Sequence, residues 1–232
     1  MRKIPKEYPW DRVKPYAFYK CALPIAAPLW LHILFRVKVV GRENLPKRSG
    51  GVIMASNHLH SIDPGFFCAA TRLPWRYIAK IELFQHKASA WALTHCNGFP
   101  VDRDTIDRRA LDYALRIMED GRAGLGIFPE GQRSKDGAPH EAKTGVAMIA
   151  RQSKADILPC SIWHDGPLKP RKKITIRFGP IIPFGELGLG EAPNKRQSKA
   201  ACDKIMAEIT RLWEMGDGWQ EGAGGREQEG GG

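Results

Sequence analysis

The stretch "GVIMASNHLHSIDPG", from Gly51 to Gly65, decides the fold. Its first six residues are apolar or small and predict a strand that runs through a sheet. After a short polar loop, Asp63 and Pro64 predict a helix start, because Asp suits the N-cap and Pro suits the first helical position. A strand that leads through a loop into a helix is typical of α/β domains. Ligands of open α/β sheets bind at the carboxyl ends of the strands, so this loop is a candidate site.

The rest of the chain alternates in the same way between strand-like and helix-like segments. Short apolar or alternating runs predict further strands at residues 36–40, 76–79, 125–128, 156–162 and 173–178. Helices are expected at residues 105–121, 144–153 and 195–216. This alternation predicts a single α/β domain over residues 37–215, with a largely parallel central sheet flanked by helices. The glycine-rich, acidic residues 216–232 are predicted to form a disordered tail.

Two of these predicted helices carry clear apolar faces. The face of the first is formed by Ile106, Ala110, Leu111, Ala114, Leu115 and Met118. That helix is expected to end at Asp120-Gly121. The basic C-terminal helix has an apolar stripe of Ile205, Ile209, Leu212 and Trp213.

The composition fits one folded domain with a basic surface. The chain has 232 residues, and a hydrophobic share of 43% excludes wholesale disorder. Its formal net charge of +11 predicts attraction to a polyanion, which could be nucleic acid, an anionic membrane surface or an acidic carrier protein. The five cysteines are scattered without CxxC spacing, which argues against a zinc ribbon or a redox pair. A reducing compartment is therefore expected.

The N-terminal residues 1–36 are basic and apolar. The uncharged run from Cys21 to Phe35 would form a helix of about 22 Å, too short for a hydrocarbon core of roughly 30 Å. The run also contains Pro24 and Pro28, which bend or break helices. We expect an apolar helical segment that contacts a membrane without spanning it; the alternative is a helix buried against the domain.

Within the loop after the first strand, His58, His60 and Asp63 allow three interpretations. An H-x-H pair opens several binuclear metal sites, but the other histidines are isolated and no second ligand cluster follows. Alternatively, the carboxylate of Asp63 folds back onto one ring nitrogen of His58, which leaves the other nitrogen to accept a proton from a hydroxyl. In the third interpretation, Asp63 only caps the helix and His58 is an ordinary loop residue. Taken alone, the stretch favours this last interpretation.

Two later turns carry groups suited to an anion. "NGFPVDRDT", at residues 97–105, is expected to be a turn that presents Arg103 before the long helix. "IFPEGQRSKDG", at residues 127–137, leads from a strand into a turn that can expose backbone N–H groups beside an arginine. Lys80 follows another predicted strand and is a further candidate phosphate ligand. Each segment alone also fits an ordinary surface loop.

Together these blocks resemble the glycerolipid acyltransferase family, whose best-known members are the 1-acylglycerol-3-phosphate acyltransferases. The family's first block, N-H-x4-D, is matched by Asn57, His58 and Asp63. The second block is matched by "GFPVDRD", the third, usually FPEGTRS, by "FPEGQRS", and the fourth by "ILPCSI". The resemblance covers roughly residues 37–182 in the family's order. Gln132 replaces the usual Thr, which leaves the acceptor less defined than the reaction.

The resemblance implies a glycerol-3-phosphate acyltransferase-like fold and acyl transfer without a metal or other cofactor. A fatty acyl group would move from acyl-CoA or acyl-carrier protein to the free hydroxyl of a lysophospholipid, most directly converting 1-acylglycerol 3-phosphate to phosphatidate. His58 would be the general base and Asp63 would orient it. The acceptor would be bound by Lys80, Arg103, Glu130, Gly131 and Arg133. The other expected partner is an anionic membrane surface, with the protein at the cytoplasmic face, peripheral or monotopic, and no nucleic acid.

Three alternatives stay open. An enzyme of the same fold could use another acceptor, such as glycerol 3-phosphate or a lyso-aminolipid. The basic charge also fits a nucleic-acid-binding protein, although the lysines of the C-terminal helix are spread rather than clustered. A metallohydrolase is the third alternative and would require stoichiometric zinc.

Overall fold

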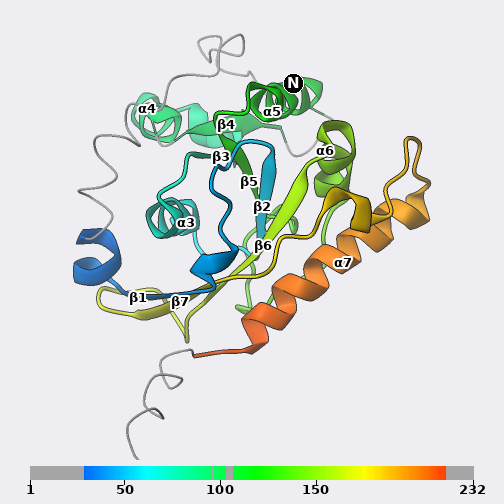
Figure 1. The fold of residues 1–232 in the computed structure, drawn as a ribbon. Coiled ribbons are helices and arrows are strands. Elements are labelled where there is room, and N and C mark those ends of the chain that lie inside the picture. The colour runs from blue at the N-terminus through cyan, green and yellow to red at the C-terminus, as the bar shows by residue number, and fades with distance from the viewer. Residues whose placement is uncertain (1–28, 96, 103–106, 218–232) are drawn as a thin grey trace, which may run out of the picture.

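A computed structural model describes residues 29–95, 97–102 and 107–217 (Figure 1). They contain a seven-stranded sheet of order β1-β7-β6-β2-β5-β3-β4. The strands are β1 (Arg36–Val40), β2 (Val52–Ser56), β3 (Trp75–Lys80), β4 (Gly98–Val101), β5 (Gly124–Ile127), β6 (Asp156–Trp163) and β7 (Lys173–Phe178). From β6 to β4 neighbouring strands are parallel, whereas β7 is antiparallel to β6 and pairs in parallel with β1. The predicted α/β domain with a largely parallel sheet is confirmed.

Strand β4 is the one strand of this sheet that the sequence did not predict. It lies inside residues 97–105, for which we expected a turn, so that expectation is wrong for Gly98–Val101. The strand is only four residues long and contains Pro100, so its sequence has no apolar run long enough to predict a strand. Proline is tolerated there because β4 is an edge strand, with a single neighbour in β3. The other six strands lie within two residues of the predicted runs.

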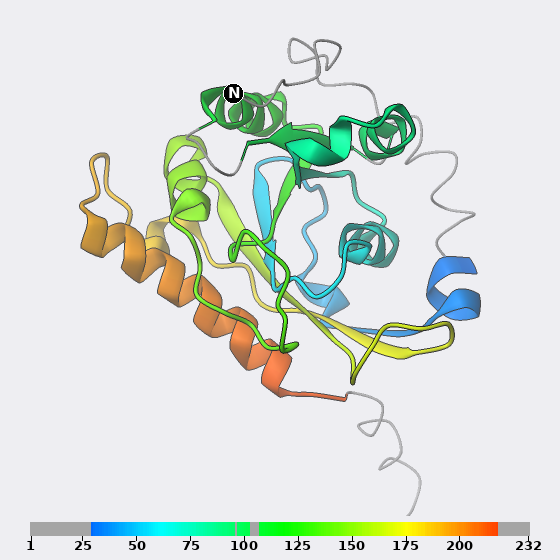
Figure 2. The same cartoon turned by 180° about the vertical axis from the view of Figure 1, so that it is seen from behind.

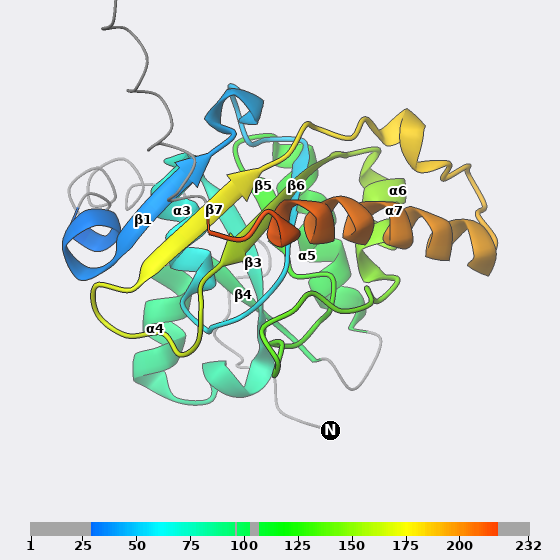
Figure 3. The ribbon, with the colours of Figure 1, turned by 90° about the horizontal axis from the view of Figure 1, so that it is seen from below.

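Helices cover both faces of the sheet, as Figures 1 and 2 show. Helix α3 (Asp63–Thr71) packs on one face, where Phe66 and Phe67 join an apolar cluster from β7 and β6. The opposite face is covered by α5 (Arg108–Asp120), α6 (Gly145–Ser153) and α7 (Lys195–Glu214). Figure 3 shows α7 running along the sheet beside β6. The remaining helical segments are α4 (Lys87–His95), which was not predicted, and the short η1 (Leu29–Leu34), η2 (Arg42–Asn44), η3 (Ile81–Phe84) and η4 (Phe184–Leu187).

The start of α3 differs from the prediction. Ile62 occupies the N-cap position without a side-chain hydrogen bond, and Asp63 is the first helical residue. The expectation that Asp63 caps the helix is therefore wrong, and Pro64 takes the second helical position. The reason is competition, because the carboxylate of Asp63 accepts hydrogen bonds from the preceding loop instead.

Helix α5 is shorter than predicted at its start. Asp107 caps it through hydrogen bonds from the backbone N–H groups of Arg109 and Ala110, and the helix ends at the expected Asp120-Gly121. Its buried face consists of Ala110, Tyr113, Ala114, Ile117 and Met118. The predicted face members Leu111 and Leu115 are only half-buried, and Ile106 lies outside the described residues. In α7 the predicted stripe is buried at Ile205, Ile209 and Leu212.

Most of the predicted N-terminal membrane segment lies outside the described residues, which begin at Leu29. In the part that is described, η1 leaves Ile33 and Leu34 exposed, while Phe35 is buried against Phe66. Among residues 29–95, 97–102 and 107–217, no helix has the length and apolar character needed to cross a bilayer. The predicted tail after Asp217 also lies outside the described residues.

Candidate active site

The predicted site residues converge on the carboxyl edge of four neighbouring parallel strands. His58 follows β2, Glu130 follows β5, and Lys80 ends β3. The strand order β2-β5-β3-β4 makes these ends adjacent. Lys80 is paired with Val101 of β4. Arg103 lies outside the described residues.

His58 and Asp63 form a hydrogen-bonded pair. Asp63 Oδ2 lies 2.9 Å from Nδ1 of His58, and it also accepts hydrogen bonds from the backbone N–H groups of Leu59 at 2.7 Å and His60 at 2.8 Å. The Asp63 side chain is fully buried. Because a carboxylate only accepts hydrogen bonds, the proton on the neutral imidazole must sit on Nδ1. Nε2 of His58 is therefore left with a lone pair, as a general base requires.

Packing fixes the imidazole ring of His58. It stacks on Phe128 with ring centroids 3.9 Å apart and planes 15° apart, and Tyr77 stacks behind Phe128 at 5.9 Å. The backbone carbonyl of His58 accepts a hydrogen bond from Ser134 N–H at 2.7 Å. Only 12% of the His58 side chain is exposed. The ring is thus held from its face, from its Nδ1 edge and through its backbone.

Asn57 ties the same loop to the neighbouring strand β6. Its Nδ2 donates to the carbonyl of Ile162 at 2.9 Å, and its Oδ1 accepts from the N–H of Ile162 at 2.9 Å. The side chain is fully buried, so this pair of bonds continues the β2–β6 ladder where the backbone of β2 turns away. An apolar residue at position 57 would leave both backbone groups of Ile162 without partners.

Glu130 lies behind the histidine rather than on the surface. Its Oε1 accepts a hydrogen bond from His58 N–H at 3.3 Å, and its Oε2 has no hydrogen-bond partner among the described residues. Burial raises the pKa of Glu130 from 4.5 to about 7, although the hydrogen bond from His58 opposes part of the rise. The carboxyl group therefore contacts the backbone of the predicted base, and its role in binding the acceptor stays a prediction.

The remaining predicted ligands are placed around this centre. Arg133 is exposed at the end of the turn after β5. Gly131 adopts φ 72°, its N–H donates to the carbonyl of Phe128 at 3.0 Å, and a side chain there would meet Lys143. Lys80 forms an ion pair with Glu82 at 3.3 Å and is half exposed.

Sequence reasoning missed several contacts of this site. Phe128 and Glu130 were visible as parts of "FPEG", but their positions against His58 depend on how β5 lies beside β2. Lys143 adds a cation next to Gly131 that no motif singled out. His164 follows β6 at the same edge, and burial lowers its pKa. In the described part of the chain, no group of three or more His, Cys, Asp or Glu side chains is arranged to hold a metal ion.

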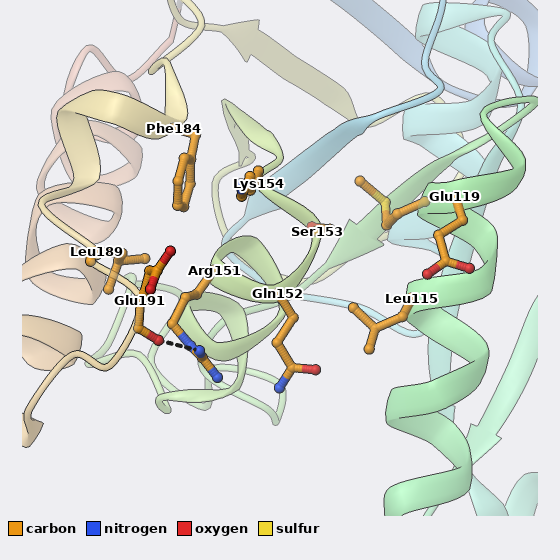
Figure 4. Close-up of a pocket in the computed structure, with 11 residues that line it drawn as sticks. Leu115, Glu119, Arg151, Gln152, Ser153, Lys154, Phe184, Leu189 and Glu191 are labelled. Atoms are coloured by element: carbon orange, nitrogen blue, oxygen red, sulfur yellow. Dashed lines mark hydrogen bonds between the residues drawn. The ribbon is translucent and has the colours of Figure 1, made fainter.

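A cavity of about 750 Å³ lies away from this site (Figure 4). It is bordered by the ends of α5 and α6, which precede β5 and β6, and so belongs to the opposite edge of the sheet. Arg151 crosses part of it to donate a hydrogen bond to the carbonyl of Glu191 at 2.7 Å. None of the predicted site residues lines it.

Comparison with known proteins decides the family. A family model described as "Acyltransferase" matches residues 36–163, which include the dyad and the turn after β5. The chain belongs to the acyltransferase family. Within this acyltransferase, the matched region runs from β1 to the end of β6.

Named relatives and a solved structure agree with that assignment. A 1-acyl-sn-glycerol-3-phosphate acyltransferase of Bacillus subtilis is 31% identical over 183 residues, covering 76% of this chain and 87% of that protein. One of Streptococcus pneumoniae is 26% identical, covering 76% of this chain and 66% of that protein. The crystal structure of the LPA acyltransferase PlsC of Thermotoga maritima matches with a TM-score of 0.59 at 25% identity, covering 85% of this chain and 77% of that one.

Proposed function

We propose that this acyltransferase moves a fatty acyl group from a thioester donor, acyl-CoA or acyl-carrier protein, to the free hydroxyl of 1-acylglycerol 3-phosphate, producing phosphatidate. The observation that carries the proposal is the His58–Asp63 pair, in which the carboxylate lies on Nδ1 of His58 and leaves Nε2 available at the carboxyl edge of the sheet. The names of the relatives support the acceptor.

His58 acts as general base in the proposed reaction. Its Nε2 takes the proton of the acceptor hydroxyl as the hydroxyl oxygen attacks the thioester carbonyl carbon. The tetrahedral intermediate collapses by breaking the carbon–sulfur bond, and the departing thiolate recovers the proton from the imidazolium. Asp63 holds the ring tautomer and stabilises the imidazolium between these two steps. Nothing is oxidised, and no cofactor takes part.

Direct attack by the acceptor is favoured over an acyl-enzyme intermediate. The three cysteines among the described residues, Cys68, Cys160 and Cys202, are buried. Burial raises the pKa of Cys160 well above its ordinary value, so its thiol is a poor nucleophile.

Of the groups predicted to bind the acceptor, Arg133, Arg103, Lys80 and the turn at Gly131 would position its phosphate. Glu130, also predicted to bind the acceptor, would in addition position the backbone of His58.

The proposal includes a location at an anionic membrane surface, peripheral or monotopic, on the cytoplasmic face. Lysophospholipid acceptors reside in membranes, and a net charge of +11 favours anionic lipid. Exposed Ile33 and Leu34 in η1 supply apolar side chains on the part of the predicted N-terminal segment that is described.

The decisive experiment replaces each histidine of the loop in turn. We expect His58→Ala to lower kcat for acyl transfer from acyl-CoA to lysophosphatidate by about 10²–10⁴-fold, the range for loss of a general base. His60→Ala is the matched control. We expect near-wild-type turnover because, within the described residues, the His60 ring accepts a hydrogen bond from Ile62 N–H at 3.4 Å and makes none to His58 or Asp63. Full activity of His58→Ala would remove the proposed mechanism.

The acceptor needs its own comparison. Glycerol 3-phosphate and a lyso-aminolipid should be assayed beside lysophosphatidate with the same donor and the same wild-type protein. If the protein prefers glycerol 3-phosphate or the lyso-aminolipid, the proposed reaction type holds and the proposed acceptor is wrong.

A further inference from the structure

A second basic site lies at the carboxyl edge of the sheet, in a pocket that the family blocks do not include. The loop between β6 and β7 and the start of β7 enclose a pocket of about 370 Å³. It is lined by Trp163 and by four cations, Lys169, Arg171, Lys172 and Lys173. Two carboxylates, Asp165 and Asp217, offset only half of that charge.

Three cations of this pocket, Lys169, Arg171 and Lys172, are not neutralised by ion pairs within the described chain. Lys169, Arg171 and Lys172 make backbone hydrogen bonds, but their side chains form neither an ion pair nor a hydrogen bond with another described residue. Arg36 adds further positive charge, because β1 pairs it with Lys173. Repulsion among clustered cations is relieved when an anion binds between them. The pocket therefore has the charge of an anion site.

The conformation of Arg171 supports this interpretation. Lys172 N–H bonds to the carbonyl of Lys169 at 3.1 Å, which closes a turn with Pro170 and Arg171 at its centre. Arg171 adopts φ 60°, a left-handed conformation that favours glycine after a proline in such turns. A turn with only a structural role would be better served by glycine. Arg171 lines the pocket and has a strained backbone conformation there, and such strain is typical of functional positions.

The pocket lies next to the catalytic loop in the sheet. Trp163 follows Ile162, which is the residue that Asn57 clamps from the other strand. Asn57 directly precedes His58, and neighbouring strands lie about 4.8 Å apart. A ligand held against Trp163 is thus close enough for an extended arm to reach the base.

We infer that this pocket binds the nucleotide end of a coenzyme A thioester, with the indole of Trp163 against the adenine and the cations on the phosphates. The inference rests on the proposed function, and it selects acyl-CoA as donor. Indole rings stack on purine bases, and guanidinium and ammonium groups bind phosphate oxygens. A concave pocket with an aromatic wall suits a planar ligand better than it suits a flat bilayer or the convex surface of a carrier protein.

Arg171→Gly is the variant that tests the site. Glycine preserves the turn and relieves the strain, so we expect the full-length variant to fold and to keep or raise its Tm. The matched control is Lys154→Gly. Lys154 is an exposed cation at the end of α6, and its backbone has the same left-handed conformation as that of Arg171, with φ 52°. Both variants lose one positive charge from the whole molecule.

The first measurement is calorimetric binding of adenosine 3′,5′-bisphosphate. We expect the wild type and Lys154→Gly to bind it equally, and Arg171→Gly to bind it about tenfold more weakly, as loss of one charge-assisted hydrogen bond predicts. Absence of binding to the wild type, or equal binding to Arg171→Gly, would overturn the inference. This readout does not depend on catalysis, so His58→Ala should bind the bisphosphate as the wild type does.

The second measurement compares donors. We expect the wild type to prefer acyl-CoA to acyl-pantetheine, which lacks the nucleotide, and Arg171→Gly to lose about tenfold of that preference in kcat/KM. If Arg171→Gly instead changes only retention on phosphatidylglycerol vesicles, the loop contacts lipid and the inference is wrong. If the wild type binds the bisphosphate but transfers no acyl group from any donor, the nucleotide pocket is supported and the proposed acyltransferase reaction is refuted.

Discussion

Glu130 makes the loop around His58 sensitive to pH. Its pKa is about 7 in the folded protein and 4.5 without burial, so between these values the folded state binds more protons than the unfolded state. The free energy of unfolding therefore falls as pH rises from 4.5 through 7. We expect Glu130→Gln, which keeps the acceptor for His58 N–H, to be more stable than the wild type by about 1–2 kcal/mol at pH 8 and similar to it at pH 4.5. Urea unfolding at a series of pH values measures this difference.

Asp136 provides a second variant for that experiment. Hydrogen bonds from Ser134, Ala138 and His140 lower the pKa of this exposed carboxyl to about 2. Its contribution to stability is present above the ordinary pKa of 3.8 and is lost as pH falls from there through about 2, below the range of that experiment. The negative charge of Asp136 also helps to raise the pKa of Glu130, so Asp136→Asn should lower that pKa and weaken the pH dependence of stability that Glu130→Gln removes. Parallel pH profiles for Glu130→Gln and the wild type would show that Glu130 is ionised normally.

The sequence predicted that His58 and Asp63 pair, but it did not predict which contacts hold the pair in place. The four loop residues between His58 and Asp63 were enough to expect contact, because a loop lets the carboxylate fold back on the imidazole, whereas on a continuous helix the two side chains would face apart. The hydrogen bonds from Leu59 and His60 could not be read from residue types, since any residue supplies a backbone N–H. The stacking on Phe128 and the burial of Glu130 follow from strand order, which no local pattern contains.

Strand β5 supports the active site through its glycines. Gly126 is paired with Tyr77, and a methyl group added at Gly126 would collide with the Tyr77 ring. Tyr77 stacks on Phe128, which stacks on His58, so displacement of Tyr77 would be passed to the base. We expect Gly126→Ala to lower the free energy of unfolding by about 1–3 kcal/mol, the cost of overpacking a core, and to lower kcat with it. Urea unfolding and the acyl-transfer assay measure the two effects.

Gly145 at the start of α6 is the matched position. An added methyl group meets no atom within 4 Å there, so Gly145→Ala should be neutral or slightly stabilising through its helix propensity. If Gly126→Ala is as stable and as active as Gly145→Ala, the aromatic stack does not position His58.

Elements with an apolar pattern of their own were predictable, and those without one were not. The five residues of β2 are all buried, which makes an uninterrupted apolar run, and α7 has a regular stripe along its twenty residues. β4 has four residues, one of them proline, and takes its conformation from pairing with β3. α4 buries little of its length and was missed for the same reason. Tertiary contacts, rather than local propensity, decide such segments.

For the whole molecule, composition predicted an attraction to polyanions without indicating where the charge would lie. The fold gathers part of it beside η1, because Arg171 N–H bonds to the carbonyl of Leu34 at 2.7 Å and Arg36 N–H bonds to the carbonyl of Lys172 at 3.0 Å. The β6–β7 loop and η1 lie side by side in Figures 1 and 2. Exposed apolar side chains and cations thus share one region of the surface, as in proteins that lie on an anionic bilayer.

Binding of the full chain to lipid vesicles should therefore depend on both charge and η1. We expect retention on phosphatidylglycerol vesicles but not on phosphatidylcholine vesicles, with a loss when salt is raised from about 0.1 M to about 1 M and the Debye length falls from ~10 Å to ~3 Å. Replacing Ile33 and Leu34 together by serine should lower retention about tenfold or more, because each buried apolar side chain contributes roughly 1.5–3 kcal/mol. Met148→Ser is the control, since Met148 is also exposed but belongs to α6 on the other face of the sheet. If both variants are retained equally, Ile33 and Leu34 do not contact the membrane. Within the described residues, vesicle binding would then depend on charge alone.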